Sequence, residues 1–410
     1  MTESQPQPNH RPSRVLLAII YATMLLFGLV ENSKGVSFPL IKAEFHAPYD
    51  SQGGMVSMTW FGYVIFCLAA SLFLHRFGIK KSVLAGYVLV CAGAVATLAA
   101  PTFWSAGLAL LIVNAGFGFY EVGTNALATV VFTSRAALMM GLMHFFYGLG
   151  AILGPKFAGT MIDQMEFTWR QVYLVMIIPT AAVFLVVVFT RFKGRTINEN
   201  ATEAPARINF ITALRSPVVW LFCLTLGFME VIEFGAANWG GLYLQDVYGL
   251  DPRTVGASFV SLFYVLFTIS RLVSGFAIEK IGYIRSLFIG LLGSILLFFF
   301  GFVLGETGIW FLPGTGFFIA IMWPTMMAVG MQVFKDDAPA VTSVIITVSG
   351  AINGVFQLVI GFTSQHIGDA WGYRSCLIYG IAALVSMYFL SMRIKTSTAN
   401  LPIPNLNLQR

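Results

Sequence analysis

The feature that most constrains this chain is a series of twelve long apolar runs separated by short polar or turn-rich breaks. About 20 apolar residues are enough for a helix to cross the hydrocarbon core of a bilayer. Inside a bilayer, only helices and closed barrels satisfy every backbone hydrogen bond. We therefore predict an all-α polytopic membrane protein with spans near 15–40, 53–74, 79–100, 103–132, 137–162, 170–190, 217–247, 254–278, 282–304, 307–332, 338–365 and 372–392.

Composition places the protein in the lipid bilayer rather than in water. Only 10% of the residues are charged and 57% are hydrophobic, giving a mean hydropathy of +0.80, whereas soluble proteins carry about 25% charged residues. The N-terminal "MTESQPQPNHRPSR" has no small-residue cleavage site after a short apolar core, so we do not expect a cleaved signal peptide. The four cysteines lie in apolar segments without metal-ligand spacing, which predicts neither a disulfide framework nor a zinc site.

The distribution of basic residues predicts the orientation. The net charge of +6 does not indicate nucleic-acid binding, because the positive charges follow membrane topology. The loops assigned to the outside hold only Lys42, Arg170, Arg253 and Arg374, while the tails, the central linker and the remaining loops are rich in Lys and Arg. This asymmetry follows the positive-inside rule. We expect a multi-pass protein of the cell (inner) membrane with both termini cytoplasmic.

The chain reads as two related halves. A polar, basic linker at 191–216 separates six spans at 15–190 from six spans at 217–392, with tails at 1–14 and 393–410. "HRFGIKKS" after the second span matches "EKIGYIRS" after the eighth, and "GLGAILGPKFAG" in the fifth matches "GAINGVFQLVIG" in the eleventh. Repeated halves with a binding site between them are typical of transporters. We predict two pseudo-symmetric six-helix bundles.

The loops after the second and eighth spans carry the pattern of a known family. "RLVSGFAIEKIGYIR" has a glycine, an acid and basic residues in order, whereas "SLFLHRFGIKK" has Ser71 and His75 in place of the usual glycine and aspartate. Over nearly its whole length the chain resembles the major facilitator superfamily. The resemblance implies a cytoplasmic charge network that holds the bundles together in the outward-open state; the alternative is a set of positive-inside anchors alone. The predicted conformational-switch residues are Arg76, Lys80, Arg271, Gly275, Glu279, Lys280 and Arg285.

Ionisable residues inside spans are candidates for function, because each costs about 2.5–3.5 kcal/mol to insert. The first span contains Glu31, Asn32 and Lys34. Glu31 and Lys34 are three residues apart, so they share a helix face and can pair. We predict proton coupling for Glu31 and substrate binding for Asn32 and Lys34; the alternative is an ion pair that only fixes packing.

The fourth span, "GFGFYEVGTNALATVVF", carries Glu121 with Asn125 one turn later, on a small and polar stripe that also includes Asn114 and Gly118. Such a stripe should face the bundle interior. No basic residue lies within a turn of Glu121 on its own helix, so we expect its carboxyl group to exchange a proton near neutral pH. The alternative is a neutral, hydrogen-bonded carboxylic acid with a structural role.

The seventh span, "MEVIEFGAANWGGLYLQD", contains two acids and a glycine-rich stretch. Glu230 and Glu233 cannot both ionise cheaply in a dry site, and we favour Glu233 as the proton-coupling group that faces the substrate. Glu230, Asn238 and Trp239 are candidate substrate contacts. We expect "GAANWGG" to unwind or bend, as substrate-lining helices often do; the alternative is a glycine-rich packing seam.

Further polar and aromatic residues complete the predicted binding set. Amides offer paired donors and acceptors, and aromatic faces stack on the apolar face of a sugar ring. Packing is the stronger alternative for Trp323 alone, and the role of Lys156 in the fifth span is left open. The additional candidates are His144, Tyr147, Trp323, Asn353 and Gln357.

Two spans carry a closer resemblance within the superfamily. The fourth is similar to that of fucose-permease-like proton:sugar symporters, with Glu121 and Asn125 in place but Ala126 where a proline often follows. The seventh, "EFGAANWGGLYL", is similar to that of glucose/mannose:proton symporters, which implies sugar contacts by Glu233 and Asn238. The first-span aspartate of fucose permeases would fall near Gly35. Lys34 stands where no base is expected, so it could compensate Glu31 or suit an anionic substrate such as a sugar acid.

We therefore predict a secondary active transporter that imports a sugar, related polyol or sugar acid with protons by alternating access. "GAILGPKFAG" resembles the helix 5 motif of drug:proton antiporters, so a drug or metabolite exporter is the first alternative, and a non-transporting sensor is the second. No enzyme motif is present. We expect a monomer with a small-molecule substrate and no cofactor or metal, driven by a proton gradient, with sodium left open.

Overall fold

The structure, a computed structural model, describes residues 13–132, 136–192 and 210–398, and these residues form helices and connections without a strand. Twelve helical segments are long and apolar enough to cross a membrane, which confirms the predicted fold class. Their bounds are Arg14–Glu44, Tyr49–Phe77, Ile79–Ala99, Phe103–Val131, Leu138–Gln164, Trp169–Phe189, Pro217–Tyr248, Pro252–Ile281, Tyr283–Val303, Gly305–Phe334, Val341–His366 and Asp369–Ile394.

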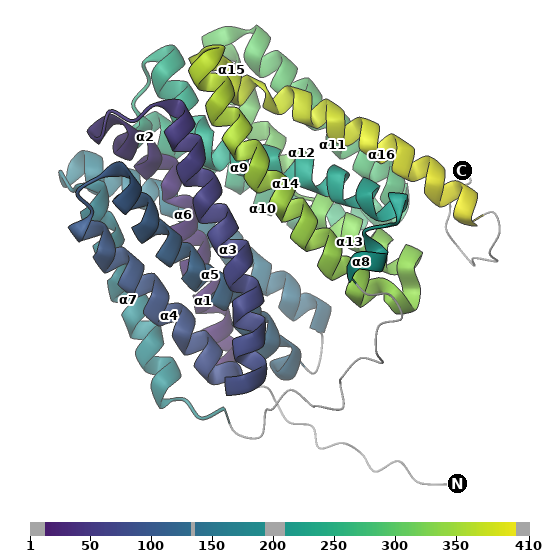
Figure 1. Ribbon diagram of the computed structural model, residues 1–410, viewed down its shortest axis with the longest axis horizontal. Helices are drawn as coiled ribbons and strands as arrows, with labels where there is room; N and C mark the ends of the chain where they lie inside the picture. The colour runs from purple at the N-terminus through teal and green to yellow at the C-terminus, as the bar shows by residue number, and fades with distance from the viewer. Residues whose placement is uncertain (1–12, 133–135, 193–209, 399–410) are drawn as a thin grey trace.

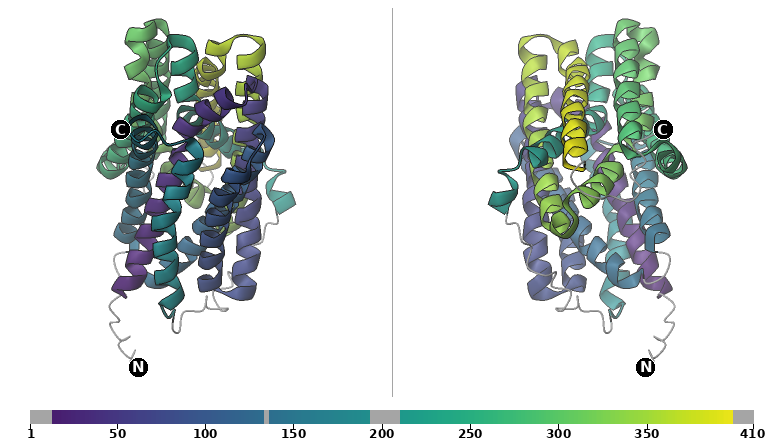
Figure 2. Two further views of the ribbon diagram at one scale, coloured as in Figure 1. Left: turned by 90° about the vertical axis from the view of Figure 1, so that its left-hand side faces the viewer. Right: turned by 90° about the vertical axis from the view of Figure 1, so that its right-hand side faces the viewer.

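The helices form two bundles that lie side by side (Figure 1). The first contains α1 (Arg14–Asn32), α2 (Lys34–Glu44), α3 (Tyr49–Phe77), α4 (Ile79–Ala96), α5 (Phe103–Val131), α6 (Ala136–Gln164) and α7 (Trp169–Phe189). After the short α8 (Phe210–Ala213), the second contains α9 (Pro217–Tyr248), α10 (Ala257–Ile281), α11 (Tyr283–Val303), α12 (Thr315–Ile319), α13 (Met322–Phe334), α14 (Ala338–His366), α15 (Asp369–Arg374) and α16 (Cys376–Thr398). Figure 2 shows the long helices of both bundles running along one common direction.

Most of the 1–14 tail, the 191–216 linker and the end of the 393–410 tail lie outside the described residues. An even number of spans places the start of α1 and the end of α16 on the same side of the membrane. We call this the terminal side and the other the opposite side. Helices α1 and α2 together make the first span, and the helix is interrupted at Ser33.

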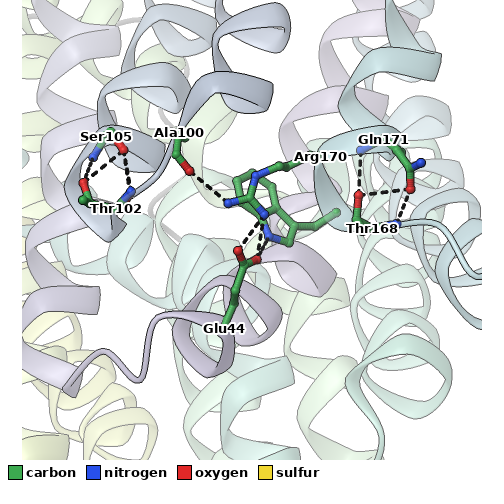
Figure 3. Close-up of polar contacts among 8 residues, drawn as sticks. Glu44, Ala100, Thr102, Ser105, Thr168, Arg170 and Gln171 are labelled. Carbon is green, nitrogen blue, oxygen red and sulfur yellow. Dashed lines mark hydrogen bonds and ion pairs between the residues drawn. The ribbon is translucent and has the colours of Figure 1, made fainter.

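Local hydrogen bonds fix two helix starts on the opposite side of the first bundle (Figure 3). Thr102 accepts from the backbone N–H of Ser105 at the start of α5, and Thr168 does the same for Gln171 at the start of α7. In each case the third residue also accepts from the backbone N–H of the cap. These reciprocal caps satisfy donors that helix N-termini otherwise leave free.

Arg170 ties the connections of the first bundle together at the same end. Its guanidinium lies 2.8 Å from the carboxylate of Glu44 and donates to the carbonyl of Ala100 at 3.0 Å (Figure 3). Trp169 also donates to Glu44, at 2.6 Å. One carboxylate therefore anchors the end of α2 to the start of α7.

Glycines allow α6 to lie directly against α1. A Cβ at Gly150 would lie 2.1 Å from the carbonyl oxygen of Leu25, and one at Gly154 would lie 2.2 Å from that of Leu29. A side chain at either position would force the two backbones apart. Close packing within the first bundle therefore accounts for Gly150 and Gly154 of "GAILGPKFAG". Its last glycine, Gly159, allows contact with the second bundle, because a Cβ there would lie 2.1 Å from the carbonyl oxygen of Arg253.

Helix α9 is continuous from Pro217 to Tyr248, so the unwinding predicted for its "GAANWGG" stretch is wrong for this conformation. The physical reason is packing between helices. A Cβ at Gly241 would lie 2.5 Å from the carbonyl oxygen of Gly35 on α2. This glycine provides a close approach between the two bundles, as the alternative interpretation of a packing seam predicted.

The two bundles contact each other in the half of the membrane nearer the opposite side. Helix α3 meets α14 through hydrogen bonds from Tyr49 N to Gln365 Oε1 (2.8 Å), from Ser57 to the carbonyl of Gly354 (2.7 Å) and from Trp60 to that of Gly350 (2.6 Å). Helix α6 meets α10 where Lys156 contacts Ser258 (2.5 Å) and Ser261 donates to the carbonyl of Ile152 (2.8 Å). These α3 residues lie in its first half, and the α14 residues lie between its middle and its end, which places the contacts away from the chain termini.

A charged cluster joins the bundles at the outer edge of this closure. Lys42 of α2 lies 3.2 Å from the carboxylate of Asp246 on α9, and the hydroxyl of Tyr49 on α3 donates to the same oxygen. The Lys42 ammonium also lies 4.1 Å from the centre of the Tyr49 ring. We call these three residues the opposite-side latch.

The terminal-side halves of the same helices are not closed. A Cβ at Gly141 of α6 or at Gly275 of α10 would meet nothing within 4 Å among the described residues. The hydrogen bonds and the ion pair described above between the bundles all lie toward the opposite side. The conformation is therefore closed on the opposite side and open on the terminal side.

Candidate functional site

The predicted pair in the first span is present. Lys34 Nζ lies 2.6 Å and 2.7 Å from the two carboxylate oxygens of Glu31 and donates to Asn114 Oδ1 of α5 at 2.9 Å. All three residues are buried. The ion pair therefore links α1, α2 and α5, and Glu31 is held by a cation in this conformation. The amide of Asn32 donates to the carbonyl of Gly28 one turn earlier.

Glu121 has a different environment. Asn125 Nδ2 donates to Glu121 Oε1 at 2.9 Å, as the one-turn spacing allows, and also to the Glu121 carbonyl at 2.8 Å. No Lys, Arg or His of the described chain lies within ion-pair distance of Glu121. Both Glu121 and Asn125 are half-buried although they lie well inside α5. Glu121 is thus a half-buried carboxyl group without a direct counter-ion among the described residues.

The two acids of α9 differ from each other. Glu230 accepts from Ser349 of α14 at 3.2 Å, and its second carboxylate oxygen is buried without a partner among the described residues. Glu233 forms no hydrogen bond or ion pair within the described chain and is half-buried. The preference for Glu233 over Glu230 as the proton-coupling group stays a prediction.

Arg271 does not lie at the switch loop with which the sequence grouped it. Its Nε donates to the carbonyl of Ala320 at 3.4 Å, and its guanidinium carbon lies 4.3 Å from the centre of the Phe267 ring. The Ala320 carbonyl is free to accept because the residue four positions later is Pro324, which has no N–H. Arg271 is therefore held well inside α10.

Side chains of both bundles lie near enough to Arg271 for their charges to interact. Arg271 of the second bundle lies within electrostatic range of Glu121, His144 and Tyr147 of the first, and of Glu233 on its own side. All are half-buried. We call the following set the inter-bundle site: Glu121, Asn125, His144, Tyr147, Glu233 and Arg271.

Other predicted contacts are engaged with one another or lie apart. Trp239 donates to Gln357 Oε1 at 2.7 Å, and Gln357 donates to Asn353 Oδ1 at 2.9 Å, which forms a buried network between α9 and α14. Asn353 Nδ2 is buried without a partner among the described residues. Asn238 is buried and Trp323 is 37% exposed. The structure does not join Asn238 or Trp323 to the inter-bundle site by a hydrogen bond among the described residues.

The remaining switch residues are on the terminal side. Lys80 donates to the carbonyls of Val188 and Thr190 at 2.7 Å and 2.9 Å, so it caps the C-terminal end of α7. Arg76, Glu279, Lys280 and Arg285 are exposed, and within the described chain no ion pair joins them across the bundles. The bundles are apart on the terminal side in this conformation, so ion pairs that join them there would be broken.

Sequence reasoning missed two aromatic residues of α3. Trp60 lies 4.3 Å from the Phe234 ring of α9 and 5.5 Å from the Tyr63 ring, measured between ring centres. Tyr63 is in electrostatic range of Glu121. Their three-residue spacing puts them on one helix face, but it does not distinguish a site wall from ordinary core packing.

Comparison with known proteins places this architecture in a family. The model of the Major Facilitator Superfamily matches residues 20–354. The chain belongs to the major facilitator superfamily. Its members are transporters, which agrees with the prediction that the chain is not an enzyme.

Individual matches are distant but nearly full-length. The chain is 22% identical to the L-fucose-proton symporter of Escherichia coli (strain K12), over 93% of each chain. It is 22% identical to a glucose/galactose transporter of Brucella abortus biovar 1 (strain 9-941), over 81% of this chain and 82% of that one. A solved bacterial homologue of the human lysosomal transporter Spinster, inward-facing and unoccupied, shares the fold with a TM-score of 0.75 at 16% identity, over 98% of this chain and 100% of that one.

Proposed function

We propose that this transporter imports a sugar, a related polyol or a sugar acid together with protons. The observation that carries the proposal is Glu121, a half-buried carboxyl group between the bundles with an amide partner and no cation at ion-pair distance in the described chain. Such a group is costly to keep ionised when the site closes around it. The names of the fucose and glucose/galactose relatives support the sugar class.

The coupling follows from the cost of closing an ionised site. With Glu121 protonated and substrate bound, the polar groups between the bundles have partners, so the bundles rock between the terminal-open and opposite-open states. With Glu121 ionised and no substrate, closure would bury a carboxylate that has no cation at ion-pair distance among the described residues, and closure is disfavoured. Glu233, which also lacks a close counter-ion among described residues, is the second proton-coupling candidate.

We further propose that the terminal side is cytoplasmic, in the cell inner membrane, and that the transporter is a monomer. The basic loops support the orientation, because the terminal side holds Arg76, Lys80, Lys280 and Arg285. Cysteines introduced at Gly78 and Gly249, in opposite loops, would test it. Reagents added to intact cells should label position 249 and not position 78.

Transport in proteoliposomes tests the function. Wild-type protein should accumulate labelled L-fucose, D-glucose, D-galactose or one of their acids when a proton gradient is directed inward, and Glu121→Gln should abolish that accumulation. Glu166→Gln, which removes an acid from the connection before α7, is the matched control and should transport normally. Expulsion of cationic dyes without sugar movement would refute the importer and favour the drug:proton antiporter.

A further inference from the structure

Arg271 presents a fixed guanidinium to the inter-bundle site. Its Nε donates to the Ala320 carbonyl that Pro324 leaves free, and its guanidinium carbon lies over the Phe267 ring, 4.3 Å from the ring centre. These two contacts orient the side chain. The two terminal nitrogens, which carry four of the five guanidinium N–H groups, form no hydrogen bond with a described residue.

A guanidinium at this depth requires an acceptor. Arginine remains charged inside proteins, and a charge within a membrane span is costly unless it is paired. None of the four ion pairs formed among the described residues includes Arg271. By contrast, Lys34, the buried cation of the first span, is fully engaged with Glu31 and Asn114. Arg271 is thus the cation of the inter-bundle site that retains donors for a ligand.

We propose that Arg271 binds the carboxylate of the substrate through its two terminal nitrogens, so that the transporter selects sugar acids over neutral sugars. The free edge of a guanidinium matches a carboxylate in a planar, two-bond arrangement. Asn125 and Tyr147 then face the hydroxyl groups, and Trp60 supplies an apolar face. The inference rests on the proposed function and narrows its substrate class.

The same arrangement accounts for the coupling of anion and proton. The titratable groups in electrostatic range of Arg271 are Glu121, His144, Tyr147, Glu233 and Tyr264. A substrate carboxylate on Arg271 adds negative charge beside Glu121 and Glu233, which favours their protonated forms. Substrate binding and protonation therefore strengthen each other by the same factor.

Matched ligands test this selection. Binding of D-glucuronate and D-glucose, and of D-galacturonate and D-galactose, is measured by calorimetry and by thermal shift on the purified full chain. The variants are Arg271→Gln, Arg271→Lys and Arg253→Gln; the last removes a positive charge from the far end of the same span. We expect the acids to bind the wild type more tightly, and Arg271→Gln to weaken acid binding about 10- to 100-fold, the range of a lost charge-assisted hydrogen-bond pair.

Arg271→Gln should weaken the binding of neutral sugars far less than that of acids. Arg271→Lys should bind acids with an affinity between those of the wild type and Arg271→Gln, and Arg253→Gln should bind all ligands as the wild type does. If Arg271→Gln does not fold, the selective loss of acid binding in Arg271→Lys decides the question. Neutral sugars binding while acids do not would overturn the inference and leave the proposed function intact. Equal effects on acids and neutral sugars would also overturn it. If neither a sugar nor a sugar acid binds the wild type, both the inference and the proposed function are refuted.

Discussion

Replacement of Lys34 by methionine is expected to destabilise the first bundle strongly. Lys34 is the cation for Glu31, at 2.6 Å, and it also holds Asn114 at 2.9 Å. Methionine keeps much of the side-chain volume but removes the charge and all three donors. The carboxylate of Glu31 would then be buried with no positive partner.

The magnitude follows from the burial of the pair. The side chains of Lys34 and Glu31 are 5% and 10% exposed, so water screens neither charge effectively. Breaking a buried pair by removing one partner costs about 3–5 kcal/mol, whereas replacing both partners by neutral groups is often close to neutral. We therefore expect Lys34→Met and Glu31→Gln each to cost about 3–5 kcal/mol and the double variant to cost about 1 kcal/mol or less. The resulting coupling energy is at least about 5 kcal/mol.

Unfolding in mixed micelles by increasing fractions of sodium dodecyl sulfate, followed by tryptophan fluorescence, measures these differences. Thr129→Ala, on the exposed end of α5, serves as a control that should stay within about 0.5 kcal/mol of wild type. Additive effects of the two single changes would refute the reasoning. They would mean that the two charges are independently solvated and that the pair is not a structural unit.

Two further predictions concern the packing of the bundles. Asp246→Asn removes the charge that Lys42 and Tyr49 share in the opposite-side latch. Cysteines introduced at positions covered by the opposite-side closure should therefore become more accessible to thiol reagents, by about 5- to 10-fold for a loss near 1–1.4 kcal/mol; unchanged accessibility would show that the latch does not hold the closed state. Gly154→Ala should lower stability by about 1–3 kcal/mol, because its Cβ would lie 2.2 Å from a backbone oxygen of α1. Gly141→Ala, in open space on the same helix, should be neutral or stabilising, and equal effects of the two would contradict the packing account.

Much of the fold was predictable because membrane burial leaves a strong signal. Apolar length and hydropathy located all twelve spans within a few residues, and repeats such as "HRFGIKKS" and "EKIGYIRS" divided them into two bundles. The spacing of Glu31 and Lys34 predicted their ion pair. Hydropathy and residue spacing are local properties of the sequence, which depend on helix geometry and on the lipid bilayer that surrounds the helices.

Contacts between distant helices were not predictable in the same way. The glycines of α9 suggested unwinding, but Gly241 instead lies against Gly35 of the other bundle, which no local pattern reveals. Trp60 looked like any other core aromatic. Arg271 was grouped with the switch motif, although its position inside the predicted span 254–278 already marked it as an intramembrane charge. The carbonyl that positions it is set free by Pro324, on another span.

The central claim is that Glu121 couples the proton to transport. The most direct measurement compares exchange with uphill accumulation in proteoliposomes containing Glu121→Gln, with the transported sugar or sugar acid. A permanently neutral group should still allow loaded carriers to exchange substrate across the membrane, but it cannot carry a proton. We predict that exchange is retained and that proton-driven accumulation is lost. Accumulation against a gradient by Glu121→Gln would contradict the account and assign Glu121 a structural role.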